Sequence, residues 1–361
     1  MNDAALHVRG VVLPSGVERD VFVQDGRFTF GPVEDARTVA AEGGFLIPGL
    51  VDAHCHLALY SPSPDASEPE AARASARLEL EAGVLALREP GSPNRLSSGI
   101  GPHEGLPRTF TAGRFLAPSG GYVQGFPREA DAEALPGAAM EELGVSGSWV
   151  KIIGDWVRPG GGWGLNYPFE ALEETSRRIH EAGGRLAMHV THHESAEMAI
   201  MAGFDSIEHG PGLSLEQIGK MAERDITWVP TVNILPSIPP FLEALGVDPQ
   251  VRAAMLRSID LYPALLAAAV EAGVRILAGT DAGMGPHGMI ANEIGLLARM
   301  GLGPLRALAA GSWEGRAFLG LPGIEEGAPA DLVAYDRDPR EDPGVLSEPF
   351  LVILDGRVVS A

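Results

Sequence analysis

Short apolar runs alternate with longer stretches of helical periodicity through the middle of the chain. Runs with the length and composition of buried strands lie at 46–53, 83–87, 108–112, 148–153, 185–190, 205–208, 226–231 and 274–279. Helical periodicity covers 69–82, 169–182, 195–202, 215–224 and 249–272. Pro168 before the second of these helices and Gly183-Gly184 after it are typical start and stop signals.

Eight strands that alternate with helices over roughly 250 residues are typical of a (β/α)8 barrel. We therefore predict an α/β fold in which residues 46–321 form a TIM barrel. A doubly wound open sheet produces the same alternation and remains the alternative.

Both ends of the chain have a different pattern, with short alternating strands and tight turns. Asp25-Gly26 and Asp355-Gly356 are hairpin-type dipeptides within these end segments. We expect residues 1–45 and 322–361 to pair into one small β-sandwich domain. Periodicity does not show which of these strands are neighbours.

Composition restricts the class of protein. The chain has 27 Lys and Arg against 48 Asp and Glu, a net charge of −21, which repels nucleic acids and anionic membranes. Cys55 is the single cysteine, so an internal disulfide framework and a cysteine-based zinc cluster are excluded. The N-terminus has no apolar core of a secretory signal, and Glu271 and Arg275 interrupt the most apolar long window. We expect a cytoplasmic protein that acts on a small molecule, with assembly into a homo-oligomer left open.

Only two of the basic residues are lysines, Lys151 and Lys220. In a sequence that otherwise uses arginine for positive charge, a lysine points to amine chemistry that a guanidinium cannot perform. Lys151 is therefore a candidate functional residue.

The segment Gly49–His56 contains an H-x-H pair. Alternate side chains of a strand share one face, so His54 and His56 point one way, and Cys55 points toward the outer helices. At the carboxyl end of a barrel strand two imidazoles can bind a divalent metal, although such a pair can also simply form hydrogen bonds.

Four further residues of metal-binding type end predicted strands: Lys151, His189, His209 and Asp281. With about 31 residues per βα unit, the spacing places the whole set on strands one, four, five, six and eight of a barrel. Packing alone does not explain such residues at five separate strand ends.

These residues lie in PGLVDAHCH, VKI, AMH, IEHG and AGTDAG, and the chain also contains a late GAPADLV. Together the motifs resemble the amidohydrolase superfamily over nearly the whole length. The EHG segment, the PTV run and His287-Gly288 are most similar to the imidazolonepropionase-related branch, which includes Xaa-Pro-type dipeptidases.

The resemblance implies a binuclear metal centre, with zinc as the expected metal. His54, His56 and Asp281 would hold one ion, His189 and His209 the other, and Lys151, carboxylated by carbon dioxide, would bridge them. A bridging water would be ionised, and Asp281 would pass its proton to the leaving amine. The implied function is hydrolysis of amide or peptide-like C–N bonds, as in a dipeptidase or N-acyl amino acid hydrolase. A lactone or cyclic amide hydrolase is the alternative.

Two other functions remain. A mononuclear heterocycle deaminase would lack the strand-four lysine and carry Glu three residues after the strand-five histidine, where this chain has His192. A metal-free scaffold would be expected to lose ligands, and all six are present.

Substrate-binding candidates are Tyr122, Trp163, His192 and His287. Trp156 and Tyr167 can contribute to the same apolar wall, and Arg158 is the candidate partner for a substrate carboxylate. The glycine-rich stretch 154–164 matches no phosphate-binding motif, and we expect it to be a flexible loop over the site.

Overall fold

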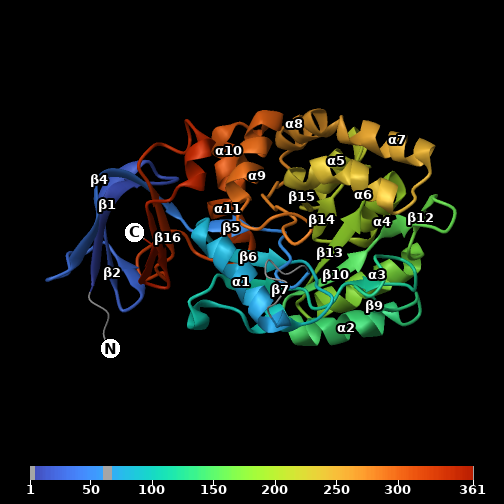
Figure 1. The fold of residues 1–361 in the computed structure, drawn as a ribbon, viewed down its shortest axis with the longest axis horizontal. Coiled ribbons are helices and arrows are strands. Elements are labelled where there is room, and N and C mark those ends of the chain that lie inside the picture. Colours follow the sequence, from blue (N-terminus) through green and yellow to red (C-terminus); the bar gives the residue numbers. More distant parts are fainter. Residues whose placement is uncertain (1–4, 60–66, 361) are drawn as a thin grey trace.

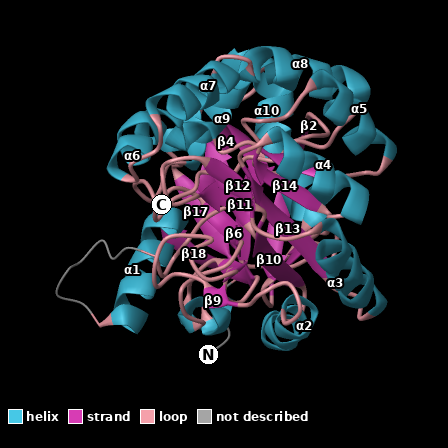
Figure 2. Cartoon of the chain, turned by 90° about the vertical axis from the view of Figure 1, so that its right-hand side faces the viewer, coloured by secondary structure: helices cyan, strands magenta, loops and turns pink. Residues whose placement is uncertain are grey.

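The computed structural model describes residues 5–59 and 67–360. A curled β-sheet contains strands from both ends of the chain, and a larger α/β part lies beside it (Figure 1). In the larger part the helices lie outside a central group of strands (Figure 2).

The curled sheet has seven strands in the order β18-β17-β16-β4-β1-β2-β3. Their bounds are Leu6–Val12 (β1), Val17–Gln24 (β2), Arg27–Thr29 (β3), Arg37–Pro48 (β4), Leu332–Tyr335 (β16), Leu351–Leu354 (β17) and Arg357–Ser360 (β18). The two ends meet where β4 runs antiparallel to β16, with Leu46 opposite Ala334. Phe28 N also donates to Ala328 O at 2.9 Å, so the edge strand β3 returns to the segment before β16. The extra domain is thus one sheet curled around its own apolar core, in place of two separate stacked sheets.

The larger part contains two groups of parallel strands, besides the β11-β12 hairpin described below. One is the parallel sheet β5-β6-β7, at Leu50–Asp52, Val84–Glu89 and Arg108–Thr111. The other has the order β15-β14-β13-β10-β8-β9, at Thr227–Val229, Ser206–His209, Arg185–Val190, Trp149–Ile153, Leu116–Ala117 and Arg128–Glu129. The result is an α/β fold of the TIM-barrel type with an extra domain.

The strand predicted at 274–279 is not a regular strand. It forms one β-bridge, between Trp228 and Ile276, and is otherwise held by single hydrogen bonds. Trp228 N donates to Arg275 O at 2.9 Å, and Ala53 N donates to Ala278 O at 2.8 Å. The segment therefore lies between β15 and β5 and connects the two groups of strands.

The helices lie at Glu68–Glu81 (α1), Leu135–Ser146 (α2), Phe169–Glu181 (α3), His193–Ala202 (α4), Leu215–Glu223 (α5), Ile238–Ala244 (α6), Pro249–Ile259 (α7), Tyr262–Ala272 (α8), Ile290–Leu297 (α9), Pro304–Ala310 (α10) and Trp313–Phe318 (α11). The predicted helix 249–272 is wrong as a single element, since it breaks into α7 and α8. Pro263 lies in the first turn of α8, where its missing N–H is tolerated, whereas a continuous helix would lose a hydrogen bond there. Within the described ranges no single helix is long and apolar enough to cross a membrane, and only α7 and α8 taken together, bent by 46°, meet those criteria.

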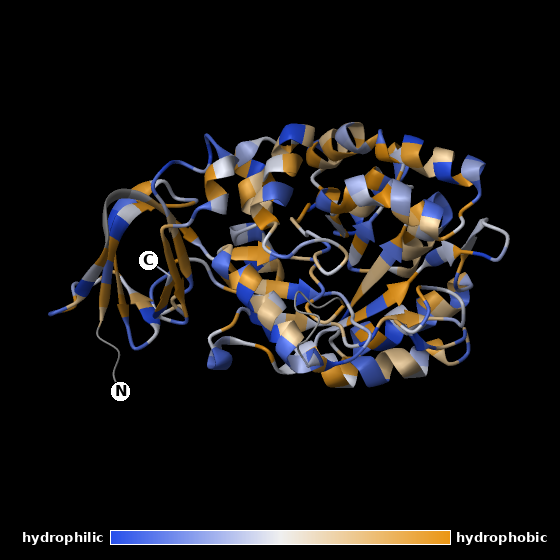
Figure 3. Ribbon diagram, viewed as in Figure 1, coloured by the Kyte–Doolittle hydropathy of each residue, from blue (hydrophilic) through white to orange (hydrophobic). Residues whose placement is uncertain are grey.

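Successive side chains along β10 point alternately toward two apolar clusters, one beneath the helices and one in the interior of the strands. On β10, Val150 and Ile152 belong to the main core beneath the helices. Trp149 faces the opposite way and packs with Val51 and Ala187 in a cluster that fills one end of the interior. Many strand segments in this region are coloured as hydrophobic in Figure 3. Lys151 lies between Val150 and Ile152, so it faces the same interior as Trp149.

The stretch 154–164 is not an irregular loop as predicted. Asp155–Val157 (β11) and Trp163–Leu165 (β12) form an antiparallel hairpin in which Trp156 pairs with Gly164. Buried Asp155 anchors the hairpin, because it accepts hydrogen bonds from Thr191 N at 2.9 Å and Trp163 Nε1 at 2.6 Å.

Candidate metal centre

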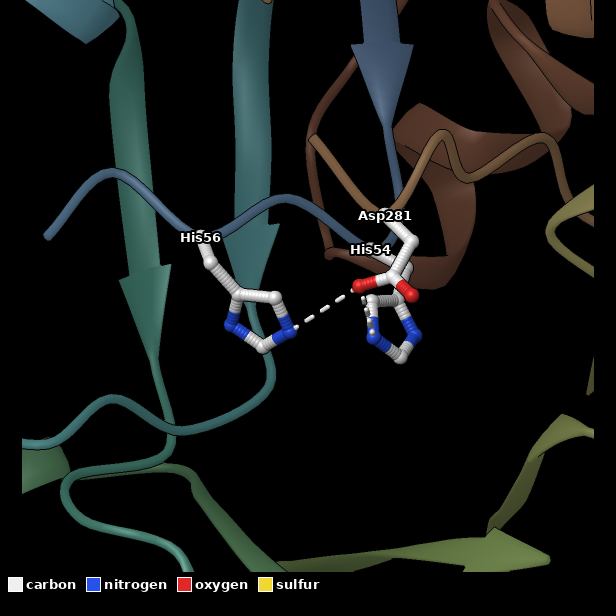
Figure 4. Close-up of side chains that lie close together, drawn as sticks. All are labelled: His54, His56 and Asp281. Carbon is white, nitrogen blue, oxygen red and sulfur yellow. Dashed lines mark ion pairs between the residues drawn. The ribbon is translucent and has the colours of Figure 1, made fainter. Parts of the chain in front are cut away.

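His54, His56 and Asp281 converge at the end of β5 (Figure 4). Asp281 Oδ1 lies 3.3 Å from His56 Nε2 and 3.5 Å from His54 Nε2. The two chain segments are tied together, since Asp281 N donates to His54 O at 2.7 Å. Buried Asp52 accepts hydrogen bonds from both His54 N and Thr280 N at 3.0 Å. These bonds hold the segment of His54 and the segment of Asp281 in place.

Three histidines have one ring nitrogen engaged away from the centre. His54 Nδ1 lies 2.6 Å from Glu208 Oε2, His56 Nδ1 lies 2.8 Å from Gly91 O, and His209 Nδ1 lies 2.8 Å from Thr231 Oγ1. Partners of this kind orient metal-binding histidines and leave Nε2 as the ligand atom. The same arrangement at three positions favours a metal centre over a set of histidines that only bond one another.

Lys151, His189 and His209 complete the cluster. The ring centroid of His209 lies 4.7 Å from that of His189 and 4.8 Å from that of His54. Lys151 Nζ and His189 Nε2 are buried and have no hydrogen-bond partner among the described residues. Buried polar atoms in proteins are almost always paired, so these two atoms indicate room for a group that they would contact. The charge of Lys151 acts on His54, His189 and His209, so the six predicted ligand residues lie in one cluster. Their donors suit divalent metal ions.

Burial determines the protonation of these groups. It lowers the pKa of Lys151 to about 8, and it lowers the pKa of His189 to about 4. Burial also holds the pKa values of His54 and His209 well below the ordinary value. Neutral imidazole is the form that binds metal, and a lysine of lowered pKa more readily supplies the neutral amine that reacts with carbon dioxide.

The backbone at the centre is strained. His209, Thr231 and Asp281 have φ values of 63°, 49° and 56°. This left-handed region costs a residue other than glycine roughly 1–3 kcal/mol, and such residues cluster at functional sites. A β-branched residue such as Thr231 is rarely found there.

The buried ion pair between Arg88 and Glu208, behind His54, was not predicted from the sequence. Glu208 of β14 receives two hydrogen bonds from Arg88 Nη2, at 2.7 and 2.8 Å, and both side chains are fully buried. Burial opposes the ionisation of Glu208, but the charges of Arg88 and Lys151 outweigh it and keep the pKa of this carboxyl below its usual value. A partial signal was present for Arg88, because it directly follows the apolar run Val84–Leu87, whereas Glu208 lies in the mixed sequence Ser-Ile-Glu-His of β14.

The predicted substrate residues separate into two pairs. Tyr122 and Trp163 line a cavity of about 170 Å³ next to His189, His209 and Asp281. His192 and His287 are not among the lining residues of that cavity. His192 is exposed and caps α4, where its Nδ1 accepts from Glu194 N at 3.5 Å. His287 is held by Glu79 of α1, with its Nδ1 2.8 Å from Oε1.

Three other residues also have places that the sequence did not show. Cys55 faces α1 as predicted, but its Sγ lies 3.7 Å from Glu79 Oε1, so its neighbour is a carboxylate. Tyr167 lies in the main core and donates to Ala130 O at 2.9 Å, so it does not wall the cavity. Arg158 does not line the cavity, and its Nη2 donates to Gly164 O at 3.2 Å and to Asn166 Oδ1 at 3.0 Å within the hairpin.

A large part of the cavity wall comes from a region without a distinctive sequence motif. Val232–Ser237 (a 3-10 helix), α6 and α7 contribute apolar side chains that include Ile238, Phe241 and Met255. Their place beside the metal-type residues depends on how this segment packs across the strand ends, which local periodicity does not encode.

The sequence profile of the amidohydrolase family matches residues 127–359. The chain belongs to the amidohydrolase family. The superfamily resemblance inferred from the motifs is thereby confirmed, and the members of this family are hydrolytic enzymes.

Among proteins similar to this amidohydrolase, an uncharacterized protein of Mycobacterium tuberculosis is 41% identical over 358 residues, which is 98% of this chain and 95% of that protein. Ochratoxinase of Aspergillus niger is 31% identical over 198 residues, which is 52% of this chain and 40% of that enzyme.

Solved structures share the fold. A Xaa-Pro dipeptidase with bound methionine in its active site superposes with a TM-score of 0.83 at 22% identity, covering 99% of this chain and 100% of that one. The A. niger ochratoxinase structure gives a TM-score of 0.80 at 19% identity, covering 100% of this chain and 96% of that one.

Proposed function

We propose that this amidohydrolase is a metal-dependent hydrolase of amide or peptide-like C–N bonds in a small-molecule substrate. Its centre would hold two divalent ions, with zinc as the expected metal. His54, His56 and Asp281 would hold one ion, His189 and His209 would hold the other, and carboxylated Lys151 would contact both. The larger part would close as a (β/α)8 barrel of residues 46–321, and residues 1–45 and 322–361 would form the small domain.

The observation that carries the proposal is the buried amine of Lys151, which has no hydrogen-bond partner among the described residues and lies in the same cluster as the imidazoles of His54, His189 and His209. A neutral amine adds to carbon dioxide and loses one proton, which yields a carbamate with two anionic oxygens. Such a group suits a position between two cations, whereas a free ammonium would be repelled there. An arginine at this position does not form a carbamate under these conditions.

When bound, the ions would lower the pKa of a water molecule toward neutrality and polarise the substrate carbonyl. The protein's own contribution is orientation and proton transfer. Glu208, the Gly91 carbonyl and Thr231 hold three imidazole rings with Nε2 facing inward. Asp281 belongs to the His54 and His56 group and also lines the cavity, which supports a role in which its carboxylate would take a proton from water and pass it to the leaving nitrogen.

Metal analysis combined with three lysine variants tests this proposal. We expect about two divalent ions per chain in the wild-type protein. Lys151→Ala should lose metal and at least about a hundredfold in kcat, and Lys151→Arg should be nearly as damaging although it keeps the charge.

Lys220→Arg is the matched control, because Lys220 lies on α5 in partly exposed ion pairs with Glu197 and Glu216 at 2.7 and 2.9 Å. It should leave metal content and kcat unchanged. Full activity in protein with well under one metal per chain, or near-normal turnover by Lys151→Ala, would overturn the proposal.

A further inference from the structure

The cavity beside the metal-type residues is walled by aromatic side chains from separate elements. Trp156 of β11 is central: its ring centroid lies 4.6 Å from Tyr122, 5.9 Å from Trp163 of β12 and 6.3 Å from Phe241 of α6. Ile238 of α6 adds to the same wall. These contacts lock the rings against one another, so the wall is a preformed apolar surface.

The cavity's size and polarity indicate what fits it. Its volume of about 170 Å³ is close to the roughly 150 Å³ of an engineered apolar cavity that binds benzene. One aromatic ring, or a branched aliphatic group of similar size, therefore fills it. His189, His209 and Asp281 also line the cavity, so a ligand would place its carbonyl near these residues and its apolar group against the aromatic wall.

The described side chains that line the cavity provide no cationic partner for a carboxylate. Among the described residues that line it, none is Lys or Arg, and residues 60–66, outside the described ranges, have the sequence YSPSPDA. Arg158 on the neighbouring hairpin does not line the cavity, and its Nη2 donates to Gly164 O and Asn166 Oδ1. The proposed ions would lie at the end of the cavity formed by His189, His209 and Asp281, where the scissile carbonyl would bind. A carboxylate held against the apolar wall, away from that end, would have no partner among the described lining residues, which is strongly unfavourable, and the net charge of −21 repels anions further.

We propose that the substrate is an uncharged amide carrying an aromatic or branched apolar group, and that Trp156 and Phe241 determine this specificity. Dipeptides and N-acyl amino acids, which carry a free carboxylate, are then poor substrates. The inference rests on the proposed function, because that function places the scissile carbonyl beside Asp281.

A matched pair of compounds tests the charge preference. N-benzoyl-phenylalanine and N-benzoyl-phenylalaninamide differ only in whether the terminus is a carboxylate or a carboxamide. With the zinc-loaded enzyme we expect kcat/KM for the carboxamide to be at least about tenfold higher. Equal values, or a preference for the carboxylate, would overturn the proposal.

Two variants test the wall itself. Phe241→Ala should raise KM for N-benzoyl substrates about tenfold while changing KM for the N-acetyl analogue much less, because only the benzoyl ring fills the cavity. Ile238→Arg should shrink the preference for the carboxamide, since it introduces a cation at the wall. Leu305→Ala is the control, because Leu305 is 52% exposed on α10 and does not line the cavity. An unchanged ratio of benzoyl to acetyl KM in Phe241→Ala would contradict the role of the wall.

A binding measurement separates failure of this inference from failure of the proposed function. Trp156 and Trp163 lie in the cavity wall, so their fluorescence reports ligand binding without turnover. If neither compound is hydrolysed by zinc-loaded enzyme, the proposed function fails in this assay, and the dissociation constants still decide the substrate class. At least about tenfold tighter binding of the carboxamide supports the inference, and equal or weaker binding refutes it.

Discussion

The structure allows the loss of stability on substitution of Arg88 to be predicted in magnitude. Its guanidinium is fully buried inside the strands, where Nε donates to Ala53 O at 2.8 Å and Nη1 donates to Ser206 Oγ at 2.9 Å. Nη2 forms the ion pair with Glu208, which in turn contacts His54 Nδ1. Arg88→Met keeps much of the apolar volume and removes the cation.

The expected cost follows from burial. Removing one partner of a buried ion pair costs about 3–5 kcal/mol, because the other charge stays behind without compensation. At about 2.1 cal/mol/K per residue, unfolding 361 residues involves an entropy change of roughly 0.76 kcal/mol/K. A loss of about 4 kcal/mol therefore lowers Tm by about 5 °C.

Thermal unfolding followed by circular dichroism measures this shift, with Arg177→Met as the control. Arg177 is 52% exposed on α3 and pairs with Glu174 and Glu181, so its loss should cost at most about 1 kcal/mol and change Tm by roughly 1 °C. The double variant Arg88→Met/Glu208→Gln should recover part of the loss, because the uncompensated charge is gone. A single variant that melts within about 1 °C of wild type, or a double variant that shows purely additive losses, would refute the reasoning.

Three further predictions concern single positions. Thr231→Val removes the partner of His209 Nδ1 and should weaken zinc binding about 10-fold to 100-fold in a chelator competition titration, and unchanged affinity would exclude the orienting role. Burial raises the pKa of Glu89 to about 8 from an ordinary value of 4.5, so the folded state retains a proton and stability falls as the pH rises from about 5 to 8. Glu89→Gln should reduce that fall in Tm, and a slope equal to that of wild type would contradict it. Gly279→Ala would place a Cβ 2.7 Å from that of His54 and should destabilise the fold by about 1–3 kcal/mol in urea unfolding, whereas a neutral result would show that the strand ends can move apart.

Local patterns determined much of the fold. The runs at 83–87, 148–153 and 185–190 became β6, β10 and β13, and four of the five predicted helices became α1, α3, α4 and α5. Apolar periodicity predicts these elements because burial of one face is a property of the segment itself. The break between α7 and α8 was missed because the apolar pattern continues through Pro263.

The candidate ligands could be identified from the sequence for a related reason. Along a strand, side-chain direction alternates with period two, so the pattern around His54 and His56 already places both imidazoles on one face. The alternation of residues around Lys151 likewise places its amine on the interior face of its strand. Parallel strands then bring their carboxyl ends to one edge, where these side chains meet.

Only the tertiary structure decided which loop side chains reach the cavity. Tyr122 and Trp163 line it, whereas His192 caps a helix and His287 packs on α1, although the sequence pattern put all four in segments after predicted strands. Loop direction depends on contacts between segments far apart in the chain, such as the hydrogen bond that Thr191 N donates to Asp155 Oδ2, and these contacts leave no periodic trace in the sequence. The sequence by itself determined which residues can bind metal and which face of a strand they occupy, while packing across the strand ends determined the shape and charge of the space beside them.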